Sequence, residues 1–179
     1  MPVNARYSLI ALIALTALAL LARMIFEARR AVKNRAAIAH IVHVNGTRGK
    51  STVARLIGAG LRAGGYAVLT KTTGTDPMYI DVSGRELPVK RRSPANIREQ
   101  LAFLRRAAAE GANALVIECM AVDPALQRES ARMLQADVGV ITNVRLDHTD
   151  VMGETREKIA DALSEMIPPN GTLVTGERD

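Results

Sequence analysis

The hydrophobic residues of the chain form one long apolar stretch at the N-terminus and a series of short apolar runs farther along. Residues 7–22 carry no charge, and the apolar stretch resumes at residues 24–26, beyond Arg23. Its length is close to the ~20 residues that a membrane-spanning helix needs, and the side chain of Arg23 can extend toward lipid head groups. We therefore expect residues 1–27 to form one transmembrane anchor.

Two other interpretations compete with the anchor. Arg6 and the small residues after it also suit a signal peptide, and an apolar helix can instead be buried inside a domain. Residues 45–52 (Asn-Gly-Thr-Arg-Gly-Lys-Ser-Thr) have the features of a nucleotide site. Because such a site needs cytosolic ATP, this segment argues against a signal peptide. Basic residues after the apolar stretch predict that the chain continues on the cytoplasmic side of the cell membrane. They are Arg23, Arg29, Arg30, Lys33 and Arg35, opposed only by Glu27.

Beyond a basic, alanine-rich connector over residues 28–39, short apolar runs alternate with amphipathic stretches. Such alternation predicts a doubly wound, mostly parallel α/β sheet over residues 40–179. The apolar runs predict strands at residues 41–45, 67–70, 114–118, 138–143 and 172–175. The amphipathic stretches predict helices over residues 51–62, from Ser93 to Gly111, over 123–134 and over 155–166.

Turn and cap residues support these boundaries. Ser83–Gly84 separates residues 78–82 from residues 85–89, and this pattern predicts a β-hairpin. Ser93–Pro94 and Asp123–Pro124 each combine a capping side chain with proline at the first helical position, which is typical of a helix start.

Composition narrows the classes of function. The chain has no Trp, two Phe and three Tyr, so we expect an aliphatic core, as in parallel sheets flanked by helices. The net charge of +6 is compatible with nucleic acid, anionic lipid or an acidic substrate. Few aromatic residues and the absence of a zinc-finger or RNA-binding signature argue against nucleic acid. The basic run at residues 90–92 is either a solvated surface or a site that attracts carboxylates.

Cys119, His40 and His43 are expected to have structural roles. Cys119 is the only cysteine, so the chain can form no internal disulfide. A lone thiol at a strand end is more typical of packing than of a nucleophile. The two histidines flank the first strand without other metal-ligating residues nearby in the sequence.

A glycine-containing segment between the first strand and the first helix has the features of a phosphate-binding loop. Glycines let backbone N–H groups close around phosphate oxygens, and the helix N-terminus adds partial positive charge. Lys50 is expected to reach the β- and γ-phosphates of ATP, and Ser51 or Thr52 to bind Mg²⁺ through its hydroxyl. The segment consists of Asn45, Gly46, Thr47, Arg48, Gly49, Lys50, Ser51 and Thr52.

This loop departs from the strict pattern G-x-x-x-x-G-K-[ST], because Val44 stands where the first glycine belongs. The alternative is an ordinary glycine turn with Lys50 in solvent. A phosphate cradle requires a strand before it and a helix after it, and the sequence predicts both. We therefore expect the loop to bind phosphate.

Polar side chains at two further strand ends are candidates for a metal site. Glu118 ends one predicted strand, and Asp147 and His148 follow Asn143 at the end of another. Ligands of open α/β sheets bind at the carboxyl ends of the strands. Mg²⁺ prefers oxygen ligands, so Glu118 and Asp147 suit it, and His148 can bind a second ion or orient water. Each residue alone is equally typical of a strand end or a polar turn.

Two segments resemble the Mur ligase superfamily. Residues 45–52 resemble its shortened phosphate loop, and residues 142–150 (Thr-Asn-Val-Arg-Leu-Asp-His-Thr-Asp) resemble its Asn-x-x-x-Asp-His-x-Asp segment. Residues 71–75, 91–100 and 118–124 resemble, more narrowly, the catalytic subunit of bacterial poly-γ-glutamate synthase. Together these segments extend over nearly the whole chain.

The resemblance implies an ATP-dependent amide ligase that forms γ-glutamyl linkages. A carboxylate of the growing chain would attack the γ-phosphate of ATP to give an acyl phosphate, and the amine of a glutamate would then displace phosphate. The resemblance also implies three kinds of partner: glutamate, the poly-γ-glutamate chain and small membrane subunits of the same synthase complex. The cofactors that it implies are ATP and Mg²⁺.

Roles for single residues follow from the same resemblance. Lys50, Asp147 and His148 are expected to be catalytic, and Ser51, Glu118 and His148 to bind the metal. Asp147 would support the metal site.

Two departures qualify this assignment. The superfamily's carbamylated lysine would fall near Leu163, where this chain has no lysine; Lys158 is the nearest and is expected on a helix surface. The resemblance also implies a longer catalytic subunit, so we expect this chain alone to be inactive. The alternatives are another Mur ligase, or a membrane-tethered P-loop ATPase or regulatory nucleotide-binding subunit, which would not need the segment at residues 147–148.

Overall fold

The computed structural model describes residues 3–91 and 95–178. It begins with helix α1 (Val3–Ala36), and the chain divides into one unit that reaches Lys33 and a second unit that begins at Asn34. Of the helices in the described residues, α1 is long and apolar enough, over Tyr7–Ala36, to cross a membrane. Most of the predicted connector is therefore helical.

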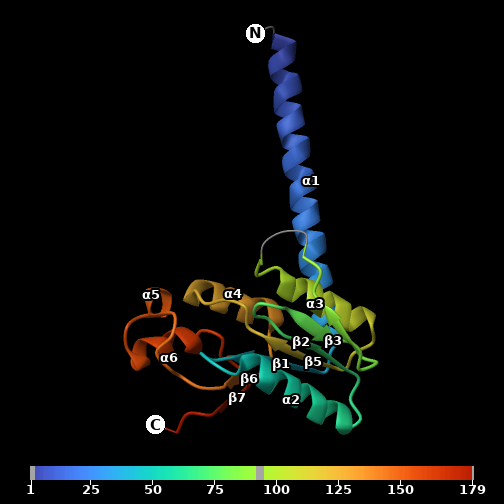
Figure 1. Cartoon of the computed structure of the whole chain (residues 1–179). Helices are drawn as coiled ribbons and strands as arrows, with labels where there is room; N and C mark the ends of the chain where they lie inside the picture. Colours follow the sequence, from blue (N-terminus) through green and yellow to red (C-terminus); the bar gives the residue numbers. More distant parts are fainter. Residues whose placement is uncertain (1–2, 92–94, 179) are drawn as a thin grey trace. The chain divides into compact units, whose positions relative to one another are not determined.

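The second unit is built on a mixed β-sheet (Figure 1). Its strand order is β4-β3-β2-β5-β1-β6-β7. Strands β2, β5, β1, β6 and β7 are parallel, and the β3–β4 hairpin adds two antiparallel strands at one edge. The mostly parallel sheet and the hairpin predicted from the sequence are both confirmed. The strands are β1 (His40–Asn45), β2 (Val68–Lys71), β3 (Met78–Ile80), β4 (Glu86–Pro88), β5 (Ala114–Glu118), β6 (Val138–Ile141) and β7 (Thr172–Thr175).

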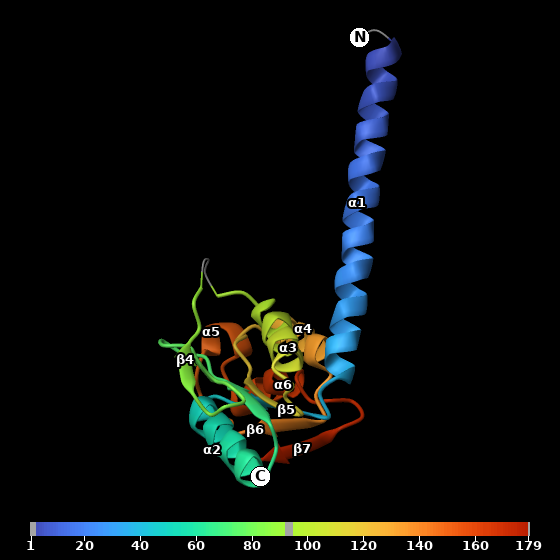
Figure 2. The same ribbon diagram turned by 90° about the vertical axis from the view of Figure 1, so that its right-hand side faces the viewer.

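Helices cover both faces of this sheet (Figures 1 and 2). Helix α2 packs on one face, and α3, α4 and α6 pack on the other. The helices of this unit are α2 (Lys50–Ala63), α3 (Glu99–Ala109), α4 (Pro124–Leu134), α5 (Thr149–Met152) and α6 (Arg156–Ser164). The fold is therefore doubly wound, with the carboxyl ends of the parallel strands along one edge.

Continuous apolar strands produce this arrangement. Side chains of a strand alternate between the two faces, so strands with helices on both sides are apolar at every position. In β5, Val116 packs on the α2 side, whereas Leu115 and Ile117 pack on the α3 side, and all three are fully buried. The core is aliphatic, as the composition predicted.

The start of α4 matches its predicted cap at Asp123, α6 begins next to the predicted helix start at Thr155, and the start of α3 differs from its prediction. Asp123 accepts a hydrogen bond from the backbone N–H of Leu126, and Thr155 accepts one from that of Lys158. The predicted start at Ser93–Pro94 lies outside the described residues. Because residues 95–98 are not helical, α3 begins later than predicted, at Glu99.

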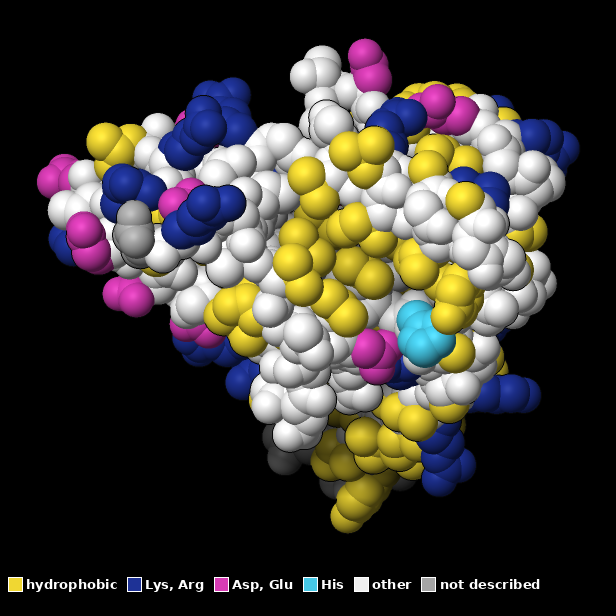
Figure 3. Space-filling view, turned by 90° about the horizontal axis from the view of Figure 1, so that it is seen from below, with side chains coloured by type: hydrophobic (Ala, Val, Ile, Leu, Met, Phe, Trp, Pro, Cys, Tyr) yellow, Lys and Arg dark blue, Asp and Glu magenta, His cyan; other side chains and the backbone are white. Residues whose placement is uncertain are grey.

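Strand β7 is an edge strand with all four residues exposed. Its register beside β6 places Val174, which is 51% exposed, on the face that α2 covers. On the side of this unit where α2 and β7 lie, hydrophobic side chains gather near the middle of the surface (Figure 3). Burial therefore differs among the five parallel strands: the central strands β1 and β5 are almost entirely buried, whereas β7 is exposed.

Helix α2 approaches β2 closely through Gly58. A Cβ atom at Gly58 would lie 2.1 Å from Oγ1 of the buried Thr70, whereas a Cβ atom at Gly60 would meet nothing within 4 Å. Because α2 begins at Lys50, this contact also sets how closely the predicted phosphate loop lies to the sheet.

Replacing these two glycines is expected to change stability in opposite directions. Gly58→Ala would force Thr70 or α2 to move, which costs roughly 1–3 kcal/mol. Gly60→Ala should stabilise the protein by up to about 1 kcal/mol, because alanine is the better helix former. Urea unfolding measures both free energies, and an equal or higher midpoint for Gly58→Ala would contradict the close approach of α2 to β2.

Candidate active site

The predicted phosphate loop connects the end of β1 to the start of α2. Gly46 and Gly49 have φ angles of 126° and 81°, which side chains with a Cβ atom rarely adopt. A Cβ atom at Gly46 would also lie 2.1 Å from Thr142 Oγ1. The two glycines therefore permit a turn that passes directly over the loop after β6.

Hydrogen bonds fix this turn to the loop after β6. Asn143 Oδ1 accepts from Thr47 Oγ1 at 2.7 Å and from the Arg48 N–H at 3.2 Å. Asn143 Nδ2 and Thr142 Oγ1 both donate to the Arg48 carbonyl, at 2.8 and 2.7 Å. Thr47 Oγ1 also accepts from the backbone N–H of Arg145. The loop after β6 therefore holds the phosphate loop in place through a network of hydrogen bonds.

Lys50 folds back over the loop. Its Nζ atom donates to the carbonyl oxygens of Gly46 at 2.7 Å and Thr47 at 3.4 Å. The charged end thus lies beside the backbone that would surround a phosphate. Carbonyl oxygens are weaker partners for an ammonium group than phosphate oxygens, because a phosphate oxygen carries negative charge and a carbonyl oxygen is neutral.

Glu118 lies next to the loop, as its predicted position at the end of β5 suggested. The residue is 3% exposed, and its Oε2 atom accepts from Ser51 Oγ and from the backbone N–H of Thr73, each at 2.7 Å. Helix α2, strand β5 and the segment after β2 therefore meet at one carboxylate oxygen. Thr52 is exposed, so Ser51 is the better candidate for a metal-binding hydroxyl.

The chemistry of this pair fits Mg²⁺. The ion takes hard oxygen ligands, usually one or two carboxylates together with phosphate oxygens and water. Ser51 and Glu118 supply a hydroxyl and a carboxylate within hydrogen-bonding distance of each other. In residues 3–91 and 95–178, no three His, Cys, Asp or Glu side chains come together as a metal site. A protein cage for a transition metal is thus absent from the described residues.

Asp147 contacts the phosphate loop, whereas His148, the next residue, has no hydrogen bond to the proposed metal-binding pair within the described residues. Asp147 Oδ2 is 3.0 Å from Nε of Arg48, so this ion pair adds to the contacts between the two loops. His148 is exposed at the start of α5 and has a φ angle of 49°, which is uncommon outside glycine. No hydrogen bond between described residues joins His148 to Ser51 or Glu118, and its metal role stays a prediction.

The basic run at residues 90–92 was expected to be solvated or to attract carboxylates. Arg91 forms two hydrogen bonds to the carboxylate of Glu99, at 2.6 and 3.1 Å. The same carboxylate lies 3.4 Å from Nζ of Lys71, a fully buried lysine whose pKa is lowered by burial. Arg91 therefore binds a carboxylate of the chain itself, while Arg92 lies outside the described residues.

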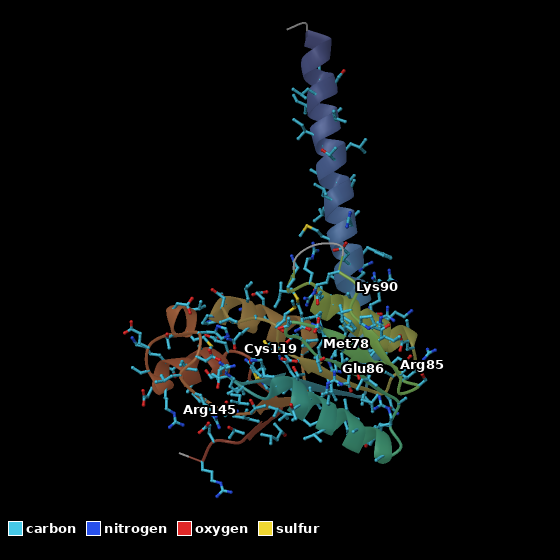
Figure 4. The ribbon with its side chains drawn as sticks, in the orientation of Figure 1. Met78, Arg85, Glu86, Lys90, Cys119 and Arg145 are labelled. Carbon is cyan, nitrogen blue, oxygen red and sulfur yellow. The ribbon has the colours of Figure 1, made fainter. Side chains whose placement is uncertain are left out.

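Two other titratable groups are buried near the strand ends. Burial raises the pKa of the Cys119 thiol to about 11 and lowers the pKa of His43 to about 3. Cys119, which is labelled in Figure 4, directly follows Glu118 in the sequence, but its thiol stays protonated at neutral pH. Both residues are uncharged in the folded protein, in keeping with the structural roles predicted for them.

Sequence reasoning missed the residues that support the loop from outside the motif. Gln127 of α4 is fully buried and accepts from Asn45 Nδ2 at 2.6 Å. Gln100 of α3 is also fully buried and donates to the carbonyl of Glu118. A glutamine within an amphipathic helix gives no signal of such a contact, because its partner lies far away in sequence.

Comparison with known proteins defines the class of this domain. A family model described as the Mur ligase middle domain matches residues 44–179. The chain therefore belongs to the Mur ligase middle-domain family. This match confirms the resemblance drawn from residues 45–52 and 142–150.

Two curated proteins show the particular relationship. The chain is 48% identical over 154 residues to "PGA synthase CapB" of Bacillus subtilis (strain 168), covering 84% of this chain and 39% of that protein. It is 47% identical over 141 residues to "Capsule biosynthesis protein CapB" of Bacillus anthracis, covering 77% of this chain and 30% of that protein. The chain thus spans less than half the length of these relatives.

Solved structures share the fold. MurF from Acinetobacter baumannii superposes with a TM-score of 0.60 at 20% identity, covering 86% of this chain and 29% of that one. E. coli FolC in complex with ADP gives a TM-score of 0.54 at 20% identity, covering 84% of this chain and 42% of that one. At this identity the likeness establishes the α/β fold of the domain.

Cys119 provides a test of burial beside the site. A pKa of about 11 rather than 9.0 lowers the thiolate fraction at pH 8 about a hundredfold. The folded protein should therefore react with a thiol reagent such as iodoacetamide at least about a hundredfold more slowly than the guanidinium-unfolded protein. Since Cys119 is the only cysteine, the rate needs no correction for other thiols. Equal rates would contradict the buried position.

Proposed function

We propose that this chain is the nucleotide-binding part of an ATP-dependent amide ligase that forms γ-glutamyl linkages in poly-γ-glutamate synthesis. The contact between Ser51 and Glu118 carries the proposal, because it joins the helix behind a phosphate loop to a buried carboxylate. Such a pair of hard oxygen ligands suits a magnesium nucleotide. The 48% identity to a PGA synthase over 84% of the chain supports the substrate class.

In this proposal, the loop at residues 45–52 binds the phosphates of ATP. Its backbone N–H groups and the N-terminus of α2 supply partial positive charge. Lys50 would exchange the carbonyls of Gly46 and Thr47 for phosphate oxygens, which are stronger acceptors. The hydrogen bonds from Thr142 and Asn143 hold the loop in shape while Lys50 moves.

Ser51 and Glu118 would hold Mg²⁺ next to these phosphates. When bound, the ion supplies positive charge that neutralises the transferring phosphoryl group. His148 is a further proposed ligand. Asp147 would support the site through its ion pair with Arg48.

The proposed reaction has two steps. A carboxylate oxygen of the growing chain attacks the γ-phosphorus of ATP, ADP leaves, and an acyl phosphate forms. The amine of an incoming glutamate then attacks the acyl carbon, phosphate leaves, and an amide bond forms with loss of a proton from nitrogen. The loop and Lys50 contribute positioning and charge, which are the main requirements of phosphoryl transfer.

We further propose that residues 1–27 anchor the protein in the cell membrane, with residues 28–39 as a connector and residues 40–179 as the ATP-binding domain in the cytoplasm. The apolar part of α1 and the basic residues after it support this arrangement. Glutamate, the polymer chain and small membrane subunits of the same synthase are the proposed partners.

Replacing Lys50 tests the ligase function. Membranes from the natural host should form γ-linked polymer together with glutamate-dependent ADP, measured as the increase over membranes without added glutamate. Introducing Lys50→Ala into the gene should lower both products at least about a hundredfold, because the phosphate charge loses its ammonium partner. Lys158→Ala is the matched control, since Lys158 is an exposed lysine on α6. Hydrolysis of ATP without glutamate and without polymer would instead identify a membrane-tethered ATPase.

Replacing Glu118 tests the metal site. Glu118→Gln keeps the size of the side chain but removes its charge, so the Mg²⁺ concentration for half-maximal nucleotide binding should rise about tenfold. Titration of the protein with Mg²⁺ at a fixed concentration of AMPPCP measures this value. Glu154→Gln, which changes an exposed glutamate, should leave it unchanged. The same half-saturation for Glu118→Gln would contradict a metal role for Glu118.

A further inference from the structure

Two buried glutamines approach the proposed nucleotide site from the face of the sheet opposite α2. Gln127 of α4 is fully buried, and its Oε1 atom accepts from Asn45 Nδ2 at 2.6 Å. Its Nε2 atom donates to the carbonyl of Val122 at 2.8 Å. Both ends of the amide are therefore used, and the side chain of the first loop residue is held by α4.

The second glutamine holds the other strand end. Gln100 of α3 is fully buried, and its Nε2 atom donates to the carbonyl of Glu118 at 3.4 Å and to Ser130 Oγ at 3.1 Å. Ser130 Oγ in turn lies 3.2 Å from His43 Nε2. Since Ser130 accepts from Gln100, its own O–H is available to donate to the neutral His43 ring.

Helix α4 connects the two contacts. Gln127 and Ser130 lie one helical turn apart, so both face the sheet at the ends of β1 and β5. These strands are neighbours, with Val44 paired to Glu118. The polar side chains therefore lie behind the two strand ends that carry the loop and the carboxylate, whereas α2 lies in front of them.

Folding alone does not account for these polar groups. His43 Nδ1 and Gln100 Oε1 are buried without a partner among the described residues. A buried donor or acceptor without a partner destabilises the folded state, and an apolar side chain of similar size avoids this cost. Leucine or methionine at these positions would give a more stable core. The polar residues therefore indicate a role in holding Asn45 and the backbone of Glu118.

We propose that Gln127 and Gln100 are positioning residues for the nucleotide site: Gln127 holds the phosphate loop through Asn45, and Gln100 holds the Glu118 carboxylate through its backbone. This inference rests on the proposed function, because it assigns the two residues to the same site. Neither side chain is expected to touch the nucleotide. The contact of Gln127 should therefore affect binding of the phosphates, and the contact of Gln100 should affect binding of the metal ion.

The test compares Gln127→Met and Gln100→Met in the full chain, held in detergent micelles. Calorimetric titration with AMPPCP, in the presence and absence of Mg²⁺, gives the affinity, and a Mg²⁺ titration gives the metal requirement. Gln127→Met should weaken AMPPCP binding about tenfold in both conditions. Gln100→Met should raise the Mg²⁺ requirement about tenfold and change metal-free binding less than about twofold.

Leu134→Met is the control, because Leu134 is a fully buried residue of the same helix outside the network. Its affinities should equal those of the unsubstituted protein at a temperature where all variants are folded. If Gln127→Met does not fold, Gln127→Asn keeps the amide but draws it back from Asn45, and the same loss is expected. Likewise, Ser130→Ala removes the hydroxyl partner of Gln100 and should raise the Mg²⁺ requirement.

The outcomes separate this inference from the proposed function. If the unsubstituted protein binds no AMPPCP, the proposed nucleotide site itself is wrong, and the inference is overturned with it. If it binds AMPPCP with Mg²⁺ but the glutamine variants match Leu134→Met, the proposed function stands and the positioning roles are wrong. Equal losses in both conditions for both variants would show a general effect on the core, which also overturns the assignment.

Discussion

The hydrogen bond from Ser51 to Glu118 is the interaction on which the candidate site depends. A carboxylate removed from water needs hydrogen bonds or opposite charge nearby, and Glu118 receives Ser51 Oγ and the Thr73 N–H at one oxygen. The bond requires α2 to lie close to the sheet, which Gly58 permits beside Thr70. A packing contact more than one helical turn into α2 thus helps to set the geometry of the site.

The phosphate loop is supported on two sides. Asn143, in the loop after β6, bonds to Thr47 and Arg48, and Gln127 bonds to Asn45 from the opposite face of the sheet. Lys50 differs from these residues, because its ammonium group bonds only to carbonyls of the loop within the described residues. A rigid backbone with one adaptable cation is suited to transfer of a phosphoryl group, in which positioning and charge contribute most.

Much of the fold was predictable, because buried parallel strands have continuous apolar sequences and their ends carry polar residues. Glu118 and the loop at residues 45–52 could be placed in this way. The late start of α3 could not, since a proline after a capping residue fits a helix start but does not determine one. The contacts of Gln100 and Gln127 were equally hidden, because they join α3 and α4 to strands far away in sequence, and only the tertiary fold brings those elements together.

The most direct test of the account is a crystal structure of the chain with Mg²⁺ and AMPPCP. The account predicts terminal phosphates within the loop at residues 45–52, Lys50 Nζ on a phosphate oxygen, and the ion between Ser51 and Glu118. Asn45 should keep its bond to Gln127. A nucleotide bound elsewhere, or an ion without contact to Glu118, would contradict the claim that this carboxylate and this loop form one nucleotide site.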